Sequence, residues 1–447
     1  MENASPPRIL IVGLDRYGMR ACVRLGLDTT VVCGAPSWDE GHIAIPDDVT
    51  VLRVDDHTNP EAVLMALDRA GLTGLPGRTG PAFDAVYTTD EDSLVMVGLL
   101  ARHLGLPFTP PEVAVRFRDK SVQKREIRAA GIATAGAEVI DDVHDVTAID
   151  RLPFERAVLK PVAGAATERT SVVTSAAELR QRSNEYRRQD TPQRTFVLEE
   201  FVRGEEWIAD GVLYEGELLF YALGRYGDPC LTAVDTGRPL HFHHFDPAAD
   251  GWAHDRALPV IKASLEALGL RDGMFHLELF HDPGTGTLTF GECAARRGGA
   301  LVQEVVQAKF NVDLAECAIQ VALGRRPALD VKVRPSVVGG AYLTAGAGLL
   351  LDCPSAAEVT ALPGVEFVRI ERPVGEYAPE VAGTGQRIGQ FMVMADSVEE
   401  LRDRFVEVWE WFRTRLVVAP DGLKPRELRE LQHVLRPAAR FGDALWQ

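Results

Sequence analysis

The hydrophobic pattern in the first quarter of the chain alternates between short apolar runs and longer amphipathic stretches. Residues 8–12 (RILIV) form an apolar run of strand length, a helical stretch follows it, and a second apolar run comes next. The pattern predicts strands at residues 8–12, 29–33, 51–54 and 85–87 and a helix at residues 94–104 that ends near Gly105. Because this strand–helix–strand order is typical of a parallel sheet, residues 1–112 are predicted to form a doubly wound α/β domain.

The pattern changes after a proline-rich break at residues 107–111. It then predicts helices at residues 118–130, with Gly131 as the C-cap, and 176–186, and strands at residues 157–160 and 195–198. A loop of small residues at 163–166 follows the first of these strands. Residues 113–205 are therefore predicted to form a small α+β region.

Strand patterns dominate from Glu206 onward. Strands are predicted at residues 207–212, 218–223, 274–281, 288–293, 336–345, 365–370 and 389–395, and helices at 257–268, 301–322, 398–412 and 426–435. The strands after residue 330 are predicted to form a closing sheet. Residues 206–447 are thus predicted to be a C-terminal α+β domain with an antiparallel sheet, and its tail from residue 420 is assigned no function.

One predicted hairpin in this domain brings two carboxylates together. Residues 282–286 (DPGTG) have turn chemistry, because proline fixes φ and glycine allows positive φ. If the hairpin is centred near Thr285, Glu278 and Glu292 lie opposite each other, with Cβ atoms about 4.5–5.5 Å apart. Like charges at that spacing repel unless one is protonated or a cation lies between them, and Mg²⁺ suits paired carboxylates. The alternative interpretation is a solvated hairpin with scattered charge.

Two further segments are candidates for binding phosphate. An arginine and glycine turn follows the second carboxylate directly, at Arg296, Arg297, Gly298 and Gly299. Lys160 ends an apolar strand just before the small-residue loop, where its ammonium can reach a phosphate that the loop N–H groups cradle. The alternative for Lys160 is a lysine that extends from a strand end into solvent.

Two other motifs carry weaker signals. Gly13 and Gly18 suggest a dinucleotide fingerprint, but Asp15 takes the place of the middle glycine, so a tight strand-to-helix turn is the favoured interpretation. The histidines of PLHFHHFDP can bind a metal in principle, yet no further ligand set is evident near His241, His243 and His244. A polar loop is the favoured interpretation of that segment.

Composition narrows the class of protein. A chain of 447 residues suggests about three domains, and 46% hydrophobic with 25% charged residues is typical of a globular protein. The net charge of −17 argues against a general nucleic-acid or anionic-membrane binder. Six widely spaced cysteines without a CxxC motif indicate reduced thiols, and no signal peptide or membrane-length apolar run is evident. A cytoplasmic location is therefore expected.

The order of these motifs resembles the ATP-grasp superfamily over nearly the whole chain. The resemblance is strongest to the carboxylate–amine ligase branch that includes bacterial L-amino acid ligases, and the architecture is similar to biotin carboxylase and D-alanine–D-alanine ligase. The motifs are RDKSVQKREIRAAGI, VLKPVAGAATERTSVV, VLEEFVRGEEW, FHLELF and FGECAARRGG. The resemblance implies a pre-ATP-grasp domain at residues 1–112, a mobile lid with its linker at 113–205, and a catalytic domain at 206–447.

The resemblance also implies a role for each matching residue. It assigns ATP binding to Lys120, Lys160, Thr167, Glu199, Glu200, Phe201, Val202 and Glu206. Within that set the two lysines bind phosphate, the 199–202 hinge binds adenine and Glu206 binds the ribose hydroxyls. It assigns Mg²⁺, with Mn²⁺ as a substitute, to Glu278 and Glu292. It places Arg296, Gly298 and Gly299 at the reacting carboxyl phosphate.

The implied activity is ATP-dependent ligation of a small-molecule carboxylate to an amine, most simply two amino acids, through an acyl phosphate. A homodimer is compatible with this branch, and neither nucleic acid nor membrane is an expected partner. Two positions depart from the family pattern: Ala294 replaces a frequent asparagine ligand, and Thr167-Glu168-Arg169 replaces serine and glycine in the mobile loop.

Three rival functions remain open at this point. One is another ATP-grasp chemistry, either carboxylation or acyl loading onto a carrier protein, although no biotinylation segment is present. Another is nucleotide binding without catalysis, which the two glutamates and Arg296 argue against. The third is a nicotinamide dehydrogenase, which the incomplete glycine fingerprint supports only weakly.

Overall fold

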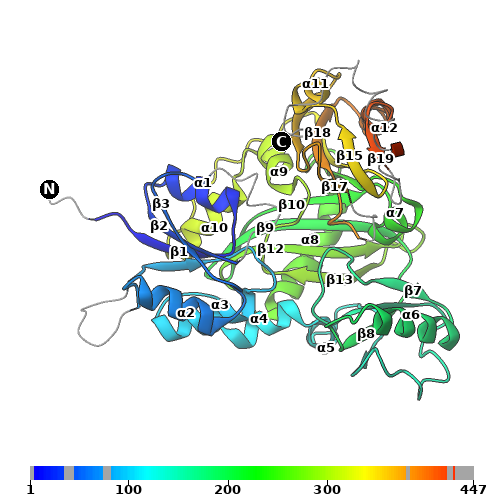
Figure 1. The fold of residues 1–447 in the computed structure, drawn as a ribbon, viewed down its shortest axis with the longest axis horizontal. Helices are drawn as coiled ribbons and strands as arrows, with labels where there is room; N and C mark the ends of the chain where they lie inside the picture. The colour runs from blue at the N-terminus through cyan, green and yellow to red at the C-terminus, as the bar shows by residue number, and fades with distance from the viewer. Residues whose placement is uncertain (1–4, 35–44, 74–81, 379–382, 420–425, 428–447) are drawn as a thin grey trace.

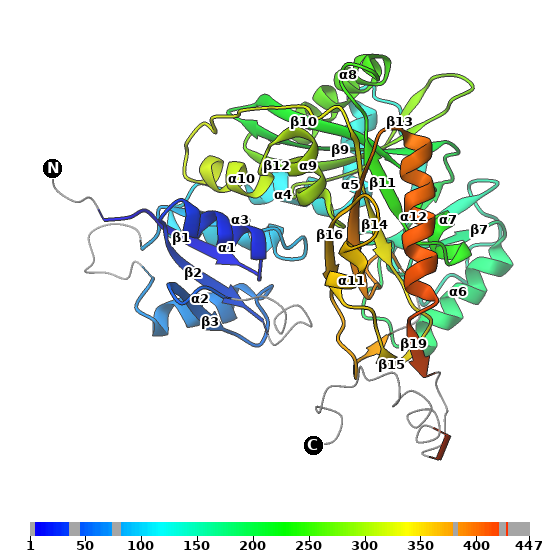
Figure 2. The ribbon, with the colours of Figure 1, turned by 90° about the horizontal axis from the view of Figure 1, so that it is seen from above.

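The computed structural model describes residues 5–34, 45–73, 82–378, 383–419 and 426–427. Within these ranges the strands form a four-stranded N-terminal sheet, a four-stranded lid sheet, an eight-stranded central sheet and a three-stranded sheet. In Figures 1 and 2 the N-terminal domain and the lid lie at opposite ends of the molecule, with the eight-stranded sheet between them. The predicted three-part division is visible in this arrangement, and its residue boundaries stay a prediction.

The N-terminal sheet is parallel and doubly wound, as predicted. Its order is β3-β2-β1-β4, with β1 (Arg8–Val12), β2 (Asp28–Cys33), β3 (Val49–Arg53) and β4 (Ala85–Tyr87). The helices are α1 (Arg16–Arg24), α2 (Pro60–Arg69) and α3 (Leu94–Leu104). Ile9 and Ile11 pack with residues of α1, whereas Leu10 and Val12 pack with α2 and α3. Alternating side chains of one strand therefore bury both faces of the sheet.

Asp15, in the glycine turn after β1, has a structural role at the start of α1. Asp15 caps α1, because its side chain accepts from the backbone N–H groups of Tyr17 and Gly18. The interpretation of this segment as a strand-to-helix turn is thus confirmed. It also lies at the carboxyl end of β1, next to β4, where the strand order of the sheet reverses.

The helix predicted at residues 118–130 is present, and a second helix that was not predicted precedes it. These are α4 (Pro111–Arg118) and α5 (Lys120–Ala129). Asp119 has extended backbone angles and caps α5 by accepting from the N–H groups of Ser121 and Val122. The prediction placed the helix start one residue before this break, because aspartate fits both a helix and its cap.

The lid is a small antiparallel sheet with one helix on it. The strand order is β5-β8-β6-β7, with β5 (Ala137–Ile140), β6 (Ala157–Pro161), β7 (Ser171–Val173) and β8 (Phe196–Glu200), and the helix is α6 (Ala176–Arg188). This confirms the predicted α+β class of the region. That the lid is mobile stays a prediction.

The eight-stranded sheet forms the centre of the protein. Its order is β13-β12-β9-β10-β11-β14-β18-β16. The strands are β9 (Glu205–Tyr214), β10 (Glu217–Tyr226), β11 (His241–His244), β12 (Gly273–His281), β13 (Leu288–Ala294), β14 (Val337–Leu343), β16 (Val365–Ile370) and β18 (Gly389–Ala395). The last three, predicted as a closing sheet, instead continue this one sheet through β11.

Helices cover both faces of the central sheet. They are α7 (Cys230–Thr236), α8 (Gly251–Leu268), α9 (Val302–Phe310), α10 (Leu314–Ala322), α11 (Ala356–Thr360) and α12 (Val398–Arg413). The face of β9 and β12 that bears Trp207, Leu277 and Leu279 packs on α8, and the opposite face packs on α9 and α10. In Figure 2, α12 runs along the β14 and β16 end. A separate small sheet contains β15 (Gly348–Asp352), β17 (Tyr377–Ala378) and β19 (Val417–Ala419).

Two sequence-based predictions in this domain are wrong. The helix predicted at 301–322 is broken into α9 and α10, because Asn311 is left-handed with φ 59° and Asp313 caps α10. The segment of His241, His243 and His244 is not a polar loop but β11, an inner strand of the sheet. The tail helix predicted at 426–435 lies outside the described residues except for 426–427.

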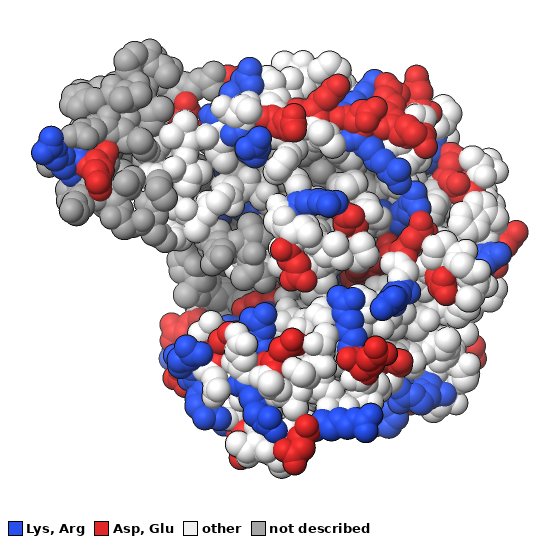
Figure 3. All heavy atoms as spheres, turned by 90° about the vertical axis from the view of Figure 1, so that its right-hand side faces the viewer, with Lys and Arg blue, Asp and Glu red and all other residues white. Residues whose placement is uncertain are grey.

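The surface charges on one face are mixed (Figure 3), and the helices are too short or too polar to span a membrane in the described part of the chain. On the face in Figure 3, acidic and basic side chains are interspersed. No helix in the described part of the chain combines the length and the apolarity needed to cross a membrane.

Candidate active site

A cavity of about 580 Å³ lies between the lid and the central sheet. Its size is within the range of small-molecule sites. Predicted site residues that line it are Lys120, Lys160, Thr167, Glu199, Glu200, Phe201, Val202, Glu206, Glu278, Glu292, Arg296, Gly298 and Gly299. The fold therefore brings the whole predicted set to one cavity, although the role of each residue stays a prediction.

The two glutamates of the hairpin lie opposite each other, as predicted. Glu278 on β12 pairs with Glu292 on β13, and the next pair is Leu279 with Phe290, so Gly291 is the extra residue of a bulge. A Cβ at Gly291 would lie 3.0 Å from the backbone oxygen of Glu278. The bulge thus leaves little room for a side chain at this point, and the register predicted from the turn is confirmed.

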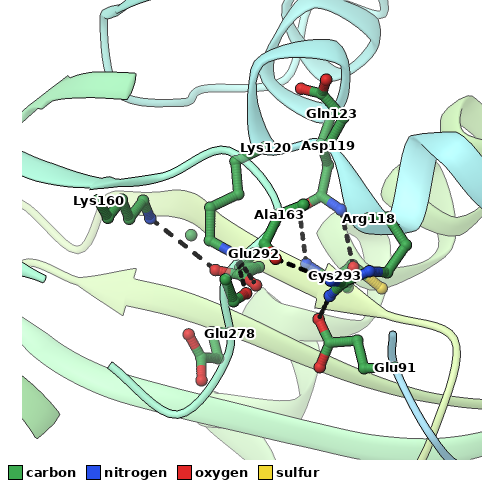
Figure 4. Close-up of polar contacts among 12 residues, drawn as sticks. Glu91, Arg118, Asp119, Lys120, Gln123, Lys160, Ala163, Glu278, Glu292 and Cys293 are labelled. Atoms are coloured by element: carbon green, nitrogen blue, oxygen red, sulfur yellow. Dashed lines mark hydrogen bonds and ion pairs between the residues drawn. The ribbon is translucent and has the colours of Figure 1, made fainter. Parts of the chain in front are cut away.

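Glu292 lies between two lysine ammonium groups (Figure 4). Its carboxylate oxygens are 2.8 Å from Lys120 Nζ and 3.8 Å from Lys160 Nζ. Burial alone would raise the pKa of Glu292, but the charges of the two lysines lower it to about 2. Glu292 is therefore ionised. Both lysines line the cavity, where their ammonium groups can bind an anionic ligand.

The two lysines also contact the lid loop and Glu199 in the 199–202 segment. Lys120 Nζ donates to the carbonyl oxygen of Gly164 at 2.7 Å, which ties the small-residue loop to α5. Lys160 Nζ lies 3.1 Å from Glu199, and Lys124, which the sequence analysis did not single out, lies 3.4 Å from the same carboxylate. Burial lowers the pKa of Lys124. Its position on α5, four residues after Lys120, is the signal that could have indicated it.

Thr167 is in the lid loop, in a strained position. Its φ is +58°, and the neighbouring Ala166 and Arg169 also have positive φ, a conformation that favours glycine. Thr384 N–H donates to Thr167 Oγ1 and to the carbonyl oxygen of Ala166, each at 3.0 Å. The lid loop thus contacts the segment before β18.

The hinge glutamates differ in their surroundings. Glu199 is 5% exposed, and the charges of Lys124 and Lys160 lower its pKa although burial opposes them. Its Oε1 has no hydrogen-bond partner among the described residues. Glu200 is exposed, and its Oε2 accepts from Gly136 N–H at 3.4 Å. The inner glutamate is thus the one whose free oxygen suits an amino-group donor.

Glu206 is buried and accepts from the backbone N–H of Cys230 at 2.8 Å. Burial, with the charge of Glu278 adding to it, raises the pKa of Glu206 to about 8. Phe201, Val202 and Phe280 also line the cavity. Apolar and aromatic walls beside one carboxyl group suit the ring and sugar of a nucleoside.

The arginine turn meets the N-terminal domain. Arg296 Nε donates to Glu91 at 2.7 Å, and Glu91 also accepts from Arg118 at 2.8 Å. Arg297 donates to Asp15 at 2.9 Å. Sequence analysis did not select Glu91 or Asp15 as site residues. Both follow parallel strands at their carboxyl ends, which is where open α/β sheets bind ligands and is the signal that could have found them.

A buried aspartate supports the glycine turn and a histidine. Asp210 on β9 is fully buried and lies opposite His276 on β12. Both of its oxygens are 3.1 Å from His276 Nδ1, and Oδ1 accepts from Gly298 N–H at 2.6 Å. Burial would lower the pKa of His276, but Asp210 raises it to about 10. His276 Nε2 is 3.5 Å from Glu278.

The protein side chains at this point fit a divalent cation that shares ligands with a nucleotide. The structure holds two facing carboxylates, and no group of three or more histidine, cysteine, aspartate or glutamate side chains gathers for a metal in the described ranges. Mg²⁺ commonly takes one or two carboxylates and completes its shell with water and phosphate oxygens. Ala294 is 3% exposed and offers no ligand atom.

Comparison with known proteins gives distant relatives. No protein-family model matches the chain. An L-arginine-specific L-amino acid ligase of Bacillus subtilis is 24% identical over 353 residues, which are 78% of this chain and 81% of that protein. Carnosine synthase 1 of Mus musculus is 26% identical over 304 residues, 62% of this chain and 35% of that protein. The chain thus spans about a third of the carnosine synthase.

Solved structures extend the likeness to nearly the whole chain. An L-amino acid ligase from Bacillus licheniformis matches with a TM-score of 0.73 and 18% identity, over 94% of this chain and all (100%) of that one. The chain has the ATP-grasp fold. A carboxyaminoimidazole ribonucleotide synthase from asperigillus clavatus, solved with ATP, matches with a TM-score of 0.68 and 15% identity, over 91% of this chain and 99% of that one. The ATP-grasp fold predicted from the motifs is therefore confirmed, including the small lid sheet and the large antiparallel sheet.

Proposed function

We propose that this protein is an ATP-dependent ligase that activates the carboxylate of one amino acid and joins it to the amine of another. The observation that carries the proposal is the facing pair Glu278 and Glu292, which lies in one cavity with two lysines and the Arg296 turn. The amino acid ligase and carnosine synthase relatives support the same reaction class.

The nucleotide is proposed to bind between the lid and the central sheet. Lys120 and Lys160 bind its phosphates, because their ammonium groups already converge on one carboxylate and can share that charge with phosphate oxygens. The 199–202 hinge and Glu206 take the adenine and ribose. Glu278 and Glu292 would hold Mg²⁺, which would neutralise negative charge on the nucleotide phosphates.

The chemistry follows from the weakness of a carboxylate as an acyl donor. A carboxylate oxygen of the first substrate attacks the γ-phosphorus, the bond to the bridging oxygen breaks, and ADP leaves. The amine nitrogen of the second substrate then attacks the carbonyl carbon of the acyl phosphate. The amide forms, and phosphate leaves with the proton of the amine.

Arg296 is proposed to stabilise the oxyanion that develops during this attack. Its guanidinium is pre-oriented by Glu91, which lies on the N-terminal domain. Closure of the lid over the cavity keeps water from the acyl phosphate. The Gly298–Gly299 turn lets backbone approach the same phosphate without side-chain interference.

The test is ADP release over pairs of L-amino acids, with the mass of each product measured. We expect release that needs two amino acids and a product mass equal to their sum less one water. Hydroxylamine in place of the amine should give an acyl hydroxamate, which reports acyl phosphate formation alone. ATP binding without ADP release in any pair, or release that requires bicarbonate, would overturn the proposal in favour of a nucleotide sensor or a carboxylation reaction.

A further inference from the structure

Asp210 connects two parts of the site that are far apart in the sequence. One branch runs from its carboxylate to His276 Nδ1 at 3.1 Å and from His276 Nε2 to Glu278 Oε1 at 3.5 Å. The other branch runs from Asp210 Oδ1 to the backbone N–H of Gly298 at 2.6 Å. One buried side chain thus contacts both the strand of the first glutamate and the turn that follows Arg296 and Arg297.

The side chains around Asp210 are buried and closely packed. Asp210 is 0% exposed, and His276 is 7% exposed. A Cβ built on Gly298 would lie 2.7 Å from His276 Nδ1 and 2.9 Å from Asp210 Oδ1. The glycine turn therefore packs directly against the aspartate and the histidine, and its hydrogen bond goes to the aspartate.

The two facing glutamates differ in what orients them. Glu292 is held by the ammonium groups of Lys120 and Lys160. The ion-pair contact of Glu278 among the described residues is with His276, which in turn contacts Asp210. Carboxylates that bind a metal are themselves held by outer contacts, and loss of such contacts costs about 10–100-fold in metal affinity or activity.

We infer that Asp210 is a positioning residue that, through His276, orients Glu278 for Mg²⁺ and at the same time fixes the Gly298 turn beside the acyl phosphate. The inference rests on the proposed function for its chemistry. A buried Asp–His pair that only stabilises the fold is the competing explanation, and the two explanations differ in what a substitution does to the Mg²⁺ requirement.

The decisive measurement is nucleotide binding as a function of Mg²⁺, which does not depend on turnover. Asp210→Asn keeps the size of the side chain and removes its charge, and His276→Gln changes the metal branch while the Gly298 contact stays. We expect each variant to need about 10-fold or more Mg²⁺ for half-maximal ADP binding. Affinity for ADP without Mg²⁺ should be unchanged within about twofold.

Kinetics separate the two branches. His276→Gln should lower kcat at low Mg²⁺ and recover most of it at high Mg²⁺. Asp210→Asn should stay slower even at saturating Mg²⁺, because the turn has also lost its carboxylate. The double variant should be little worse than Asp210→Asn alone, since residues that act through one another are non-additive.

Asp246→Asn is the matched control. Asp246 is half-buried, forms an ion pair with the buried Lys309 at 2.7 Å and does not line the cavity. It should lose stability in urea unfolding without any change in Mg²⁺ requirement. If Asp210→Asn and His276→Gln behaved like this control, the positioning role would be overturned and the pair would be structural. If Asp210→Asn did not fold, His276→Gln alone would decide by the same criterion. A wild-type protein that binds Mg²⁺ and ADP but forms no amide would overturn the proposed function instead.

Discussion

Two groups of buried histidines lie in the same eight-stranded sheet and have opposite electrostatics. His276 on β12 faces the carboxylate of Asp210, which raises its pKa to about 10 against the effect of burial. On β11, burial lowers the pKa of His243 to about 3 and that of His244 to about 4. Neither ring nitrogen of His244 has a hydrogen-bond partner among the residues that the structure describes.

The difference shows that a partner, not burial, decides what a histidine does. A fully buried imidazole that has no hydrogen bond to a carboxylate stays neutral and packs as an aromatic ring. His244 makes edge contacts with the rings of Phe242 and Phe310, each with centroids 5.7 Å apart. The histidine-rich segment that attracted attention in the sequence is thus part of the core, whereas the isolated His276 lies at the cavity.

If this contrast holds, substitution of charged residues that line the cavity should lower activity, and substitution of a histidine on β11 should change stability alone.

The largest effect on activity is expected for Glu292→Ala. It removes a proposed Mg²⁺ ligand and leaves Lys120 and Lys160 without their shared carboxylate. We expect kcat to fall by at least about 10³-fold, since charge stabilisation by a metal is worth several kcal/mol.

Steady-state ADP release at saturating substrates measures that loss. Glu217→Ala is the control, because Glu217 is exposed and pairs only with Arg326 among the described contacts. Retention of more than a tenth of wild-type kcat by Glu292→Ala would break the assignment of the carboxylate pair.

Arg296→Ala should have the next largest effect. Loss of one oxyanion donor should slow ligation by about 10²–10³-fold and leave nucleotide affinity nearly unchanged. Arg296→Lys should rescue only in part, because an ammonium lacks the planar fork that Glu91 orients. Rate at saturating ATP and nucleotide affinity are to be measured for both. Weaker ATP binding with an unchanged saturated rate would mean that Arg296 serves the nucleotide.

Lys160→Ala should act on binding more than on rate. A charge-assisted contact to phosphate contributes about 1–3 kcal/mol, so ATP affinity should fall by about 5–150-fold. Calorimetric titration with ATP tests this, with Lys332→Ala as the control because Lys332 is 69% exposed. Unchanged affinity would place the phosphates elsewhere in the cavity.

The smallest effect on activity is expected for His244→Phe, within about twofold. The unfolded chain takes up a proton at His244 near pH 6.5, whereas the folded protein does so only near pH 4, because its pKa is lowered to about 4. Stability is therefore retained above pH 6.5 and falls by up to about 1.4 kcal/mol per pH unit as the pH drops towards 4.

Phenylalanine cannot take up that proton, so the variant should lose less stability between pH 7 and pH 5, by about 2 kcal/mol. Urea unfolding at the two pH values measures the difference. His103→Phe, on an exposed histidine, is the comparison variant for the same substitution outside the core. An unchanged slope in His244→Phe would break the contrast between the two histidine groups.

Much of the fold could be predicted because its signals are local. The helix at Leu94–Leu104 ends at Gly105 in the left-handed conformation, as its sequence indicates, and the strands Val365–Ile370 and Gly389–Ala395 have the predicted bounds. The break at Asn311 was missed because asparagine fits either a helix or its end, and the helix before Asp119 was missed because its first residues were interpreted as part of a proline-rich break. Strand β11 was missed because its three histidines were counted as polar residues, which indicated a loop.

The carboxylate pair could also be predicted, since it depends only on a turn and the two-residue period of a hairpin. Glu278 and Glu292 are joined by 13 intervening residues that fold back on themselves. The contacts that surround this pair could not be predicted in the same way, because they join residues far apart in the sequence. Lys120 and Glu292 are 172 positions apart, Arg296 and Glu91 are 205 apart, and His276 and Asp210 are 66 apart.

By itself, then, the sequence determined the classes of the elements, the parallel start, the glutamate register and the motif order that resembles the ATP-grasp superfamily. Only the tertiary structure decided which charges meet. The order of strands in the central sheet puts β9 beside β12, and the packing of the N-terminal domain brings Glu91 and Asp15 to the arginine turn. Backbone periodicity is a property of neighbouring residues, whereas the pKa and orientation of a side chain depend on the charges that the whole fold places around it.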